Sequence, residues 1–361
     1  MRTKLVITAI LIQCLILGWM AAEREWIVRT GPSVWLRTAP VDPRDLFRGD
    51  YVTLGYEISN IPAEKFGPAL KQHMAGLAKG NPDSPYPGGR EIVIFATLEV
   101  QPGSGVAELV TADLTPPPAG LFIKGRVRTY WNAGQSNALT RVAYGIDAYY
   151  VQQGKGRELE RRAPEGMPPG IQVPMEMEVA LGRNGTAVLK THRWNTLGIG
   201  VQIQNEAGPD TAQPPTAPNN KARKTIRVTL SNPGTAPLAV VLPTDLRTLR
   251  IQRVQNSGAA GEDAGVPRDN LPPLTDADVR LLQPGESATV DIDPARDEWF
   301  VATGPDEPPQ PLAHMGNNYQ GFRIVYEPPA AAACQGLKEA ARIIPGALPS
   351  RQFSSYEFRN P

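Results

Sequence analysis

The chain has 361 residues, enough for two domains of ordinary size that each bury a core. Its 37 Lys and Arg residues balance 36 Asp and Glu residues, and the formal net charge of +1 argues against a nucleic-acid partner. With 37 Pro and 34 Gly, the composition excludes a largely helical protein and predicts short strands joined by many turns.

The N-terminus carries an apolar segment, Leu5 to Ala22, preceded by two basic residues. This layout predicts a transmembrane helix, although a cleaved signal peptide shares it. Cleavage after Ala22 would place Met20, which is not small, at the third position back. We therefore expect residues 1–22 to be an uncleaved signal anchor in the inner (cytoplasmic) membrane, single-pass, with the body in the periplasm. The alternative is secretion after signal cleavage.

Residues 23–204 are predicted to form a first domain, an antiparallel β domain with one helix. The helix is expected over Ala63–Ala78, where apolar residues repeat at helical spacing. Runs of alternating or continuous apolar residues indicate the strands. These are Ser33–Arg37, Tyr51–Ile58, Glu91–Val100, Ala107–Leu114, Phe122–Trp131, Ala138–Val151, Gln172–Ala180 and Ala187–Trp194.

Residues 205–223 are proline-rich and almost free of large apolar residues, which predicts a linker. Residues 224–361 then read as an immunoglobulin-like β-sandwich, because short strands alternate with Pro-Gly turns. The expected elements are strands Lys224–Ser231, Leu238–Leu242, Leu249–Val254, Val279–Leu282, Ser287–Ile292, Trp299–Thr303, Gly321–Tyr326 and Arg351–Phe358, with a short helix over Gln335–Ile343.

Two motifs stand out in the first domain. One is a turn cluster that leads through a Gly-Asp corner into an aromatic strand, and the other is a tyrosine-rich strand that enters a Gly-Lys-Gly turn. Together they resemble the GDYxxLxY protein family over residues ~24–200. The resemblance implies a bacterial protein that works with an integral membrane partner. The motif residues, which we take as candidate interaction residues, are Asp42, Pro43, Gly49, Asp50, Tyr51, Leu54, Tyr56, Tyr149, Tyr150, Gly154, Lys155 and Gly156.

The order of segments is also distantly similar to bacterial signal peptidases, with Lys124 in the segment that matches their base. The nucleophile position is occupied by Val41, which has no hydroxyl, and a Ser–Lys dyad needs both members. Chance, shared ancestry with a lost active site, and replacement by another hydroxyl such as Thr38 or Thr53 remain open. A catalytic Lys124 should be buried beside a hydroxyl.

We predict no metal site and no cofactor. The cysteines, Cys14 and Cys334, cannot form a thiolate site, and the histidines have no ligand spacing. The aspartates that crowd the first motif are interpreted as turn formers, compensated by neighbouring arginines that include Arg37. The first tryptophans of the chain, Trp35 among them, are expected in an interfacial belt beside the anchor.

The sequence thus predicts a non-catalytic, membrane-anchored binding or accessory protein of the bacterial cell envelope. Its expected mode is strand addition along Tyr51–Tyr56 or Tyr149–Val151. One alternative is a divergent signal-peptidase-like peptidase. Another is a carbohydrate-binding envelope protein, which would require Trp299 to lie open on a surface.

Overall fold

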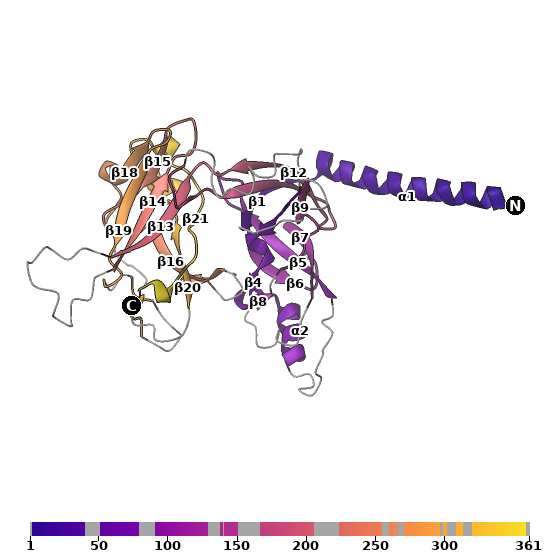
Figure 1. Cartoon of the computed structure of the whole chain (residues 1–361), viewed down its shortest axis with the longest axis horizontal. Coiled ribbons are helices and arrows are strands. Elements are labelled where there is room, and N and C mark those ends of the chain that lie inside the picture. Colours follow the sequence, from indigo (N-terminus) through magenta and orange to yellow (C-terminus); the bar gives the residue numbers. More distant parts are fainter. Residues whose placement is uncertain are drawn as a thin grey trace, which may run out of the picture.

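The computed structural model describes residues 2–39, 51–78, 91–128, 138–139, 141–150, 167–205, 224–254, 260–263, 265, 271–296, 299–301, 308–312 and 320–358. Within these ranges the chain is mainly β, with two α-helices and several antiparallel sheets (Figure 1). The predicted fold class, a mainly β protein with an apolar N-terminal helix, is confirmed.

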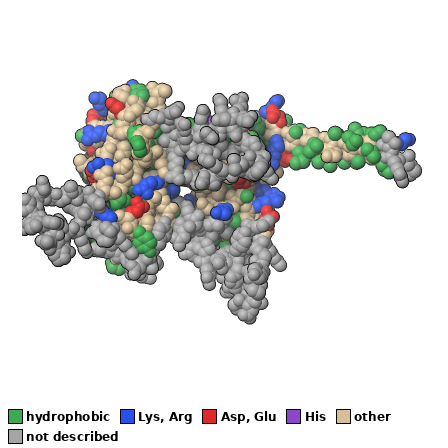
Figure 2. All heavy atoms as spheres, viewed as in Figure 1, with side chains coloured by type: hydrophobic (Ala, Val, Ile, Leu, Met, Phe, Trp, Pro, Cys, Tyr) green, Lys and Arg blue, Asp and Glu red, His purple; other side chains and the backbone are tan. Residues whose placement is uncertain are grey.

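Helix α1 (Arg2–Thr30) leaves the β-rich body as a long rod (Figure 1). Apolar side chains surround it, and Figure 2 shows them exposed along its length. Among the described residues, α1 is the helix long and apolar enough to cross a membrane. It continues past the predicted end at Ala22 and stops at Gly31, where an added Cβ would stand 2.6 Å from the carbonyl oxygen of Leu181.

The last turns of α1 are docked on the body. The Arg24 guanidinium donates to the carbonyl oxygen of Ala187 at 3.0 Å. Ile27 is buried, and Gly182 leaves room for it, because a Cβ at Gly182 would lie 3.0 Å from Cδ1 of Ile27. The helix is therefore fixed to the turn between the strands that end at Leu181 and begin at Ala187.

The first core lies between two sheets, closed by a helix. One sheet has the order β12-β11-β1-β3 and the other β6-β5-β7, and β2–β9 and β4–β8 form two-stranded pairs. The elements are β1 (Ser33–Ala39), β2 (Tyr51–Thr53), β3 (Gly55–Tyr56), β4 (Ile61–Pro62), α2 (Pro68–Ala78), β5 (Glu91–Val100), β6 (Ala107–Asp113), β7 (Leu121–Arg128), β8 (Ala138–Leu139), β9 (Ala148–Tyr150), β11 (Met175–Leu181) and β12 (Ala187–Trp194), with 3₁₀ turns Glu57–Ser59 and Ala63–Lys65.

Helix α2 begins later than the sequence predicts. The Ala63–Lys65 stretch is a separate 3₁₀ turn, and the α-helix starts at Pro68, a residue suited to the first helical position. Asp113, at the end of β6, caps this end by accepting a hydrogen bond from the Leu70 amide at 2.8 Å.

The second core lies in the C-terminal half of the chain. Its sheets have the orders β10-β13-β14-β19 and β17-β16-β20-β21, with β22 paired to β20 and a separate β15–β18 pair. The immunoglobulin-like topology stays a prediction. The strands are β10 (Ile171–Gln172), β13 (Gly198–Asn205), β14 (Lys224–Ser231), β15 (Leu238–Val241), β16 (Leu249–Val254), β17 (Ala260–Asp263), β18 (Val279–Leu282), β19 (Ser287–Ile292), β20 (Gly321–Tyr326), β21 (Leu348–Pro349) and β22 (Phe353–Ser354).

The division between the cores differs from the one expected. Strand β13, which the sequence analysis does not predict, pairs with β14 along its whole length. Leu197, Ile199 and Val201 accordingly belong to the second core. Residues 206–223 lie outside the described residues, but they connect two strands of one sheet and so do not separate the cores.

Three further expectations change. The predicted strand Ala138–Val151 survives only at its ends as β8 and β9, because Arg141 and Gly145 adopt left-handed φ values of 56° and 76°. The helix expected over Gln335–Ile343 is replaced by one short 3₁₀ turn, Ala340–Arg342, and another 3₁₀ turn, Ala331–Cys334, precedes it. The final strand is only β22, followed by a 3₁₀ turn over Ser355–Phe358.

Candidate functional site

The two sequence motifs lie side by side. Strand β2 pairs with β9 in antiparallel register, with Tyr51 opposite Tyr150 and Val52 opposite Tyr149. The pairing continues past β2, because the Leu54 amide donates to the carbonyl oxygen of Asp147 at 2.7 Å. The site is therefore a ribbon made from both motifs, which we call the motif ribbon (β2 and β9).

Two buried tyrosines brace this ribbon by reciprocal hydrogen bonds. Tyr56, from the first motif, donates its hydroxyl to the carbonyl oxygen of Ile146 at 2.9 Å. Tyr144, which precedes β9 and the second motif, donates to the carbonyl oxygen of Ile58 at 2.7 Å. Each tyrosine thus satisfies a buried acceptor on the other segment, which fixes the two segments against each other.

The electrostatics around these tyrosines keep both hydroxyls protonated. Burial raises the pKa of Tyr56 and of Tyr144, and the nearby carboxylate of Asp147 raises both further. Burial also raises the pKa of Asp147, although the backbone amides of Gly145, Asp147 and Tyr144 donate to its carboxylate and oppose the shift. The tyrosines act here as hydrogen-bond donors, so their role is structural.

A glycine on β7 makes room for the second tyrosine. A Cβ at Gly125 would stand 2.6 Å from Cγ1 of Val142 and 2.8 Å from Cε1 of Tyr144. Glycine inside a strand commonly marks such a close approach. This accounts for the glycine in the Ile-Lys-Gly-Arg-Val segment that resembles the signal-peptidase base segment.

The other predicted interaction residues are placed as follows. Leu54 is buried in the first core, and Tyr150 is 77% exposed on the motif ribbon. The hydroxyl of Tyr149 lies 3.2 Å from Nδ1 of His192, and the two rings meet edge to face. The remaining candidates fall outside the described residues: Asp42, Pro43, Gly49, Asp50, Gly154, Lys155 and Gly156.

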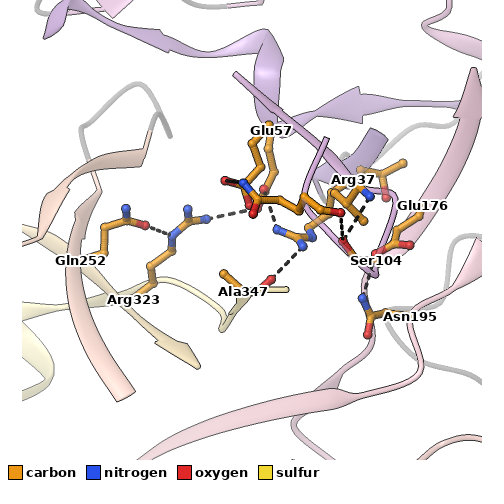
Figure 3. A network of polar contacts seen from close by, with 12 residues as sticks. Arg37, Glu57, Ser104, Glu176, Asn195, Gln252, Arg323 and Ala347 are labelled. Atoms are coloured by element: carbon orange, nitrogen blue, oxygen red, sulfur yellow. Dashed lines mark hydrogen bonds and ion pairs between the residues drawn. The ribbon is translucent and has the colours of Figure 1, made fainter. Parts of the chain in front are cut away.

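The first motif ends at an ionic contact between the two halves of the molecule. Glu57, directly after Tyr56, lies 3.3 Å from Nη1 of Arg37 on β1 and 3.2 Å from Nη1 of Arg323 on β20 (Figure 3). Arg37 also donates to the carbonyl oxygen of Ala347 at 2.8 Å. Arg37 is only 7% exposed. We call Arg37, Glu57 and Arg323 the bridging triad.

The triad controls the charge state of its carboxylate. Burial alone would raise the pKa of Glu57, but the guanidinium groups of Arg37 and Arg323 outweigh it, and the net shift is downward. Glu57 is therefore ionised at neutral pH. The described partners of Arg37 are Glu57 and Ala347. The motif aspartates that Arg37 is expected to compensate lie outside the described residues.

A second polar cluster adjoins the triad. Glu176 on β11 accepts from Nε of Arg193 and from the side-chain amide of Asn195, each at 2.7 Å. Arg193 also donates to the carbonyl oxygen of Ser104 at 2.6 Å and lies over the ring of Trp35 at 4.0 Å. Trp35 is therefore part of this cluster on the body, and its place in an interfacial belt stays a prediction.

The conditions for the two alternative functions are not met. The Lys124 side chain is exposed on β7, whereas a catalytic lysine should be buried beside a hydroxyl. Trp299 is 4% exposed and packs in the second core, so it offers no open platform for a sugar. Among the described residues, no group of His, Cys, Asp and Glu has the geometry of a metal site.

Comparison with known proteins places the motif ribbon in a family. The model of the GDYXXLXY protein family matches residues 13–191. This part of the chain belongs to that family. The GDYXXLXY domain begins within α1 and ends in β12, so it holds both motifs and the first core but not the second. No curated protein matches the chain.

Sequence reasoning missed most of the polar residues of the site. Glu57 and Arg323 carry no local signal, because they are 266 positions apart and belong to different cores. Tyr144 does carry a local sequence signal, because it alternates with the buried Val142 and Ile146 at the start of the tyrosine-rich segment. That alternation marks an inward-facing tyrosine, which needs a buried acceptor.

Proposed function

We propose that this GDYXXLXY protein is a non-catalytic accessory subunit, anchored by α1 in the inner membrane, with its body in the periplasm. Its motif ribbon would engage an integral membrane partner. The observation that carries the proposal is the pairing of both family motifs into one ribbon next to a helix able to cross a membrane. Within the described residues, β2 and β9 pair only with each other, which leaves backbone groups for an added strand.

The surroundings of the ribbon suit a binding role. Its inner side is held by the reciprocal bonds of Tyr56 and Tyr144, so the backbone that would pair is already ordered. Preorganisation lowers the entropy lost on binding. The exposed Tyr150 supplies a large amphipathic side chain of the kind enriched at protein interfaces.

The proposal is tested by purifying the full-length chain from native membranes and identifying what remains bound by mass spectrometry. We expect a membrane protein in stoichiometric amount. Tyr150→Lys, which places a charge on the ribbon, should abolish its recovery, because a charged edge opposes strand addition.

The matched control is Tyr356→Lys, since Tyr356 is another exposed tyrosine, in the C-terminal half of the chain. It should leave the partner bound. A partner retained by both variants would contradict the role of the ribbon. A wild-type chain that purifies alone would contradict the accessory-subunit proposal itself.

A further inference from the structure

The outer face of the β6-β5-β7 sheet combines apolar and basic side chains. On the inner face, Ile94, Ala96 and Ile123 are fully buried in the first core. The alternate positions point outward, and their register pairs Val93 with Arg126 and Phe95 with Lys124. Val93 is 37% exposed, and the rings of Phe95 and Phe122 meet edge to face at 5.9 Å.

This face is continuous with the base of α1. The turn between β11 and β12 touches both: a Cβ at Gly185 would lie 2.7 Å from Cε2 of Phe122, and one at Gly182 would meet Ile27. The Lys124 amide also donates to the carbonyl oxygen of Gly185 at 2.8 Å. Phe122 and Lys124 are therefore separated from the end of α1 only by the turn between β11 and β12.

If α1 spans a bilayer, this placement brings the face to the headgroup layer. The apolar segment ends at Ala22, and a helical rise of 1.5 Å per residue puts Ile27 roughly 7.5 Å further on. The headgroup region adds about 5–7 Å on each side of the hydrocarbon core. Figure 1 shows the C-terminal half on the far side of the body from α1, so the first core is the membrane-proximal part.

The charge of the face matches an anionic surface. Lys124 and the nearby Arg183 are exposed, and neither side chain has a partner among the described residues. Arg126 is the third cation, and Glu91 pairs with it at 3.8 Å. Figure 2 shows both basic and acidic side chains where the helix joins the body. Each basic residue near an anionic bilayer strengthens its association about fivefold.

We propose that the outer face of the β6-β5-β7 sheet, with Val93, Phe122 and Lys124, rests on the anionic lipid headgroups of the membrane that holds α1, together with Arg183 of the adjacent turn between β11 and β12. The inference rests on the proposed membrane anchor. The aromatic and aliphatic side chains lie among the headgroups, and the basic side chains meet the lipid phosphates.

The test uses the full-length chain reconstituted into vesicles. A fluorophore is attached at Val93→Cys in a Cys14→Ala background, where the remaining Cys334 is buried. Quenching by headgroup-spin-labelled lipid is compared in phosphatidylcholine vesicles and in vesicles containing 30% phosphatidylglycerol. The control label is at Thr289→Cys, an exposed position on β19 of the second core.

We expect quenching at position 93 to exceed that at position 289 at least threefold in anionic vesicles. Lys124→Glu with Arg183→Glu should lower it to the level at position 289. The matched double variant, Arg280→Glu with Lys338→Glu, reverses two exposed cations of the second half and should leave it unchanged. Equal quenching at both positions in a chain that floats with the vesicles would overturn the headgroup contact alone. A chain that does not float would overturn the anchor, and the headgroup contact with it.

Discussion

At the scale of single residues, the hydroxyl groups of Tyr56 and Tyr144 hold the two segments of the motif ribbon in their relative position. Both rings are buried, and each hydroxyl is the donor that satisfies a carbonyl on the opposite segment. Phenylalanine would fill the same space but would leave that carbonyl without its donor. A buried acceptor left unsatisfied costs about 1–3 kcal/mol.

Tyr144→Phe should therefore lower the free energy of unfolding by about 1–3 kcal/mol. Denaturant unfolding in detergent, followed by tryptophan fluorescence, measures the change. Tyr356→Phe is the control, because Tyr356 is exposed and its substitution should shift the midpoint little. An equal shift in the two variants would show that the bond to Ile58 does not contribute.

At the scale of single residues, the sequence predicts which side chains are buried better than it predicts which residues they contact. The burial of Leu54 and Tyr56 follows from alternation in the motif. The contact of Glu57 with Arg323 does not, because charge pairing over such a distance along the chain depends on how the two cores dock. Lys124 was singled out because its segment matches the base segment of signal peptidases in order along the chain. That match did not predict its environment, because the Lys124 side chain is exposed.

At the scale of elements, strands are predicted best where the apolar pattern is uninterrupted. Glu91–Val100, Ala187–Trp194 and Lys224–Ser231 have their predicted bounds. Strand β13 was missed because Gly198 and Gly200 weaken its pattern, yet both are close-packed: a Cβ at either would lie 2.7 Å from the side chain of Ile171. A glycine that is required because another residue packs closely against the backbone gives little indication of a strand in the sequence.

The same reasoning predicts the effect of a glycine substitution on β7. Gly125→Ala should lower the free energy of unfolding by about 1–3 kcal/mol, because the new methyl group would overlap Val142 and the ring of Tyr144. Gly76→Ala on α2 should instead raise it by about 0.5–1 kcal/mol, since no atom lies within 4 Å and alanine favours a helix. Thermal unfolding of both variants measures this, and a shift in the same direction would contradict the packing argument.

For the whole molecule, the bridging triad links the two cores through one carboxylate. Glu57 is 30% exposed and lies between two guanidinium groups, one from each half. Removing the carboxylate would leave Arg37 buried without its ionic partner, which is costly. The contact therefore ties the orientation of the second core to the end of the family motif.

Glu57→Gln should lower the free energy of unfolding at pH 7 by about 1–3 kcal/mol, less than for a fully buried pair. The pKa of Glu57 is lowered in the folded state, so its carboxylate stabilises the fold above the ordinary glutamate pKa of about 4.3 and loses that contribution as pH falls through the folded value. Wild type and variant should thus converge only once the pH falls below the lowered pKa of Glu57 in the folded state. Unfolding midpoints between pH 3 and 7 measure this, with the exposed Glu99→Gln as control. A gap that does not narrow would contradict the ionic role of Glu57.

The docking of α1 has a mechanical consequence. Arg24, Ile27 and Gly31 hold the helix to the body without a flexible joint, so the helix and the first core would tilt together as a lever. As a helix, Leu5–Ala22 measures roughly 27 Å, close to the hydrocarbon thickness of about 30 Å. In a thinner bilayer the helix would tilt further so that its apolar length stays buried. Because the helix and the body would tilt together, the second core would be displaced sideways over the membrane. Bilayer thickness would then set where the far end of the protein reaches.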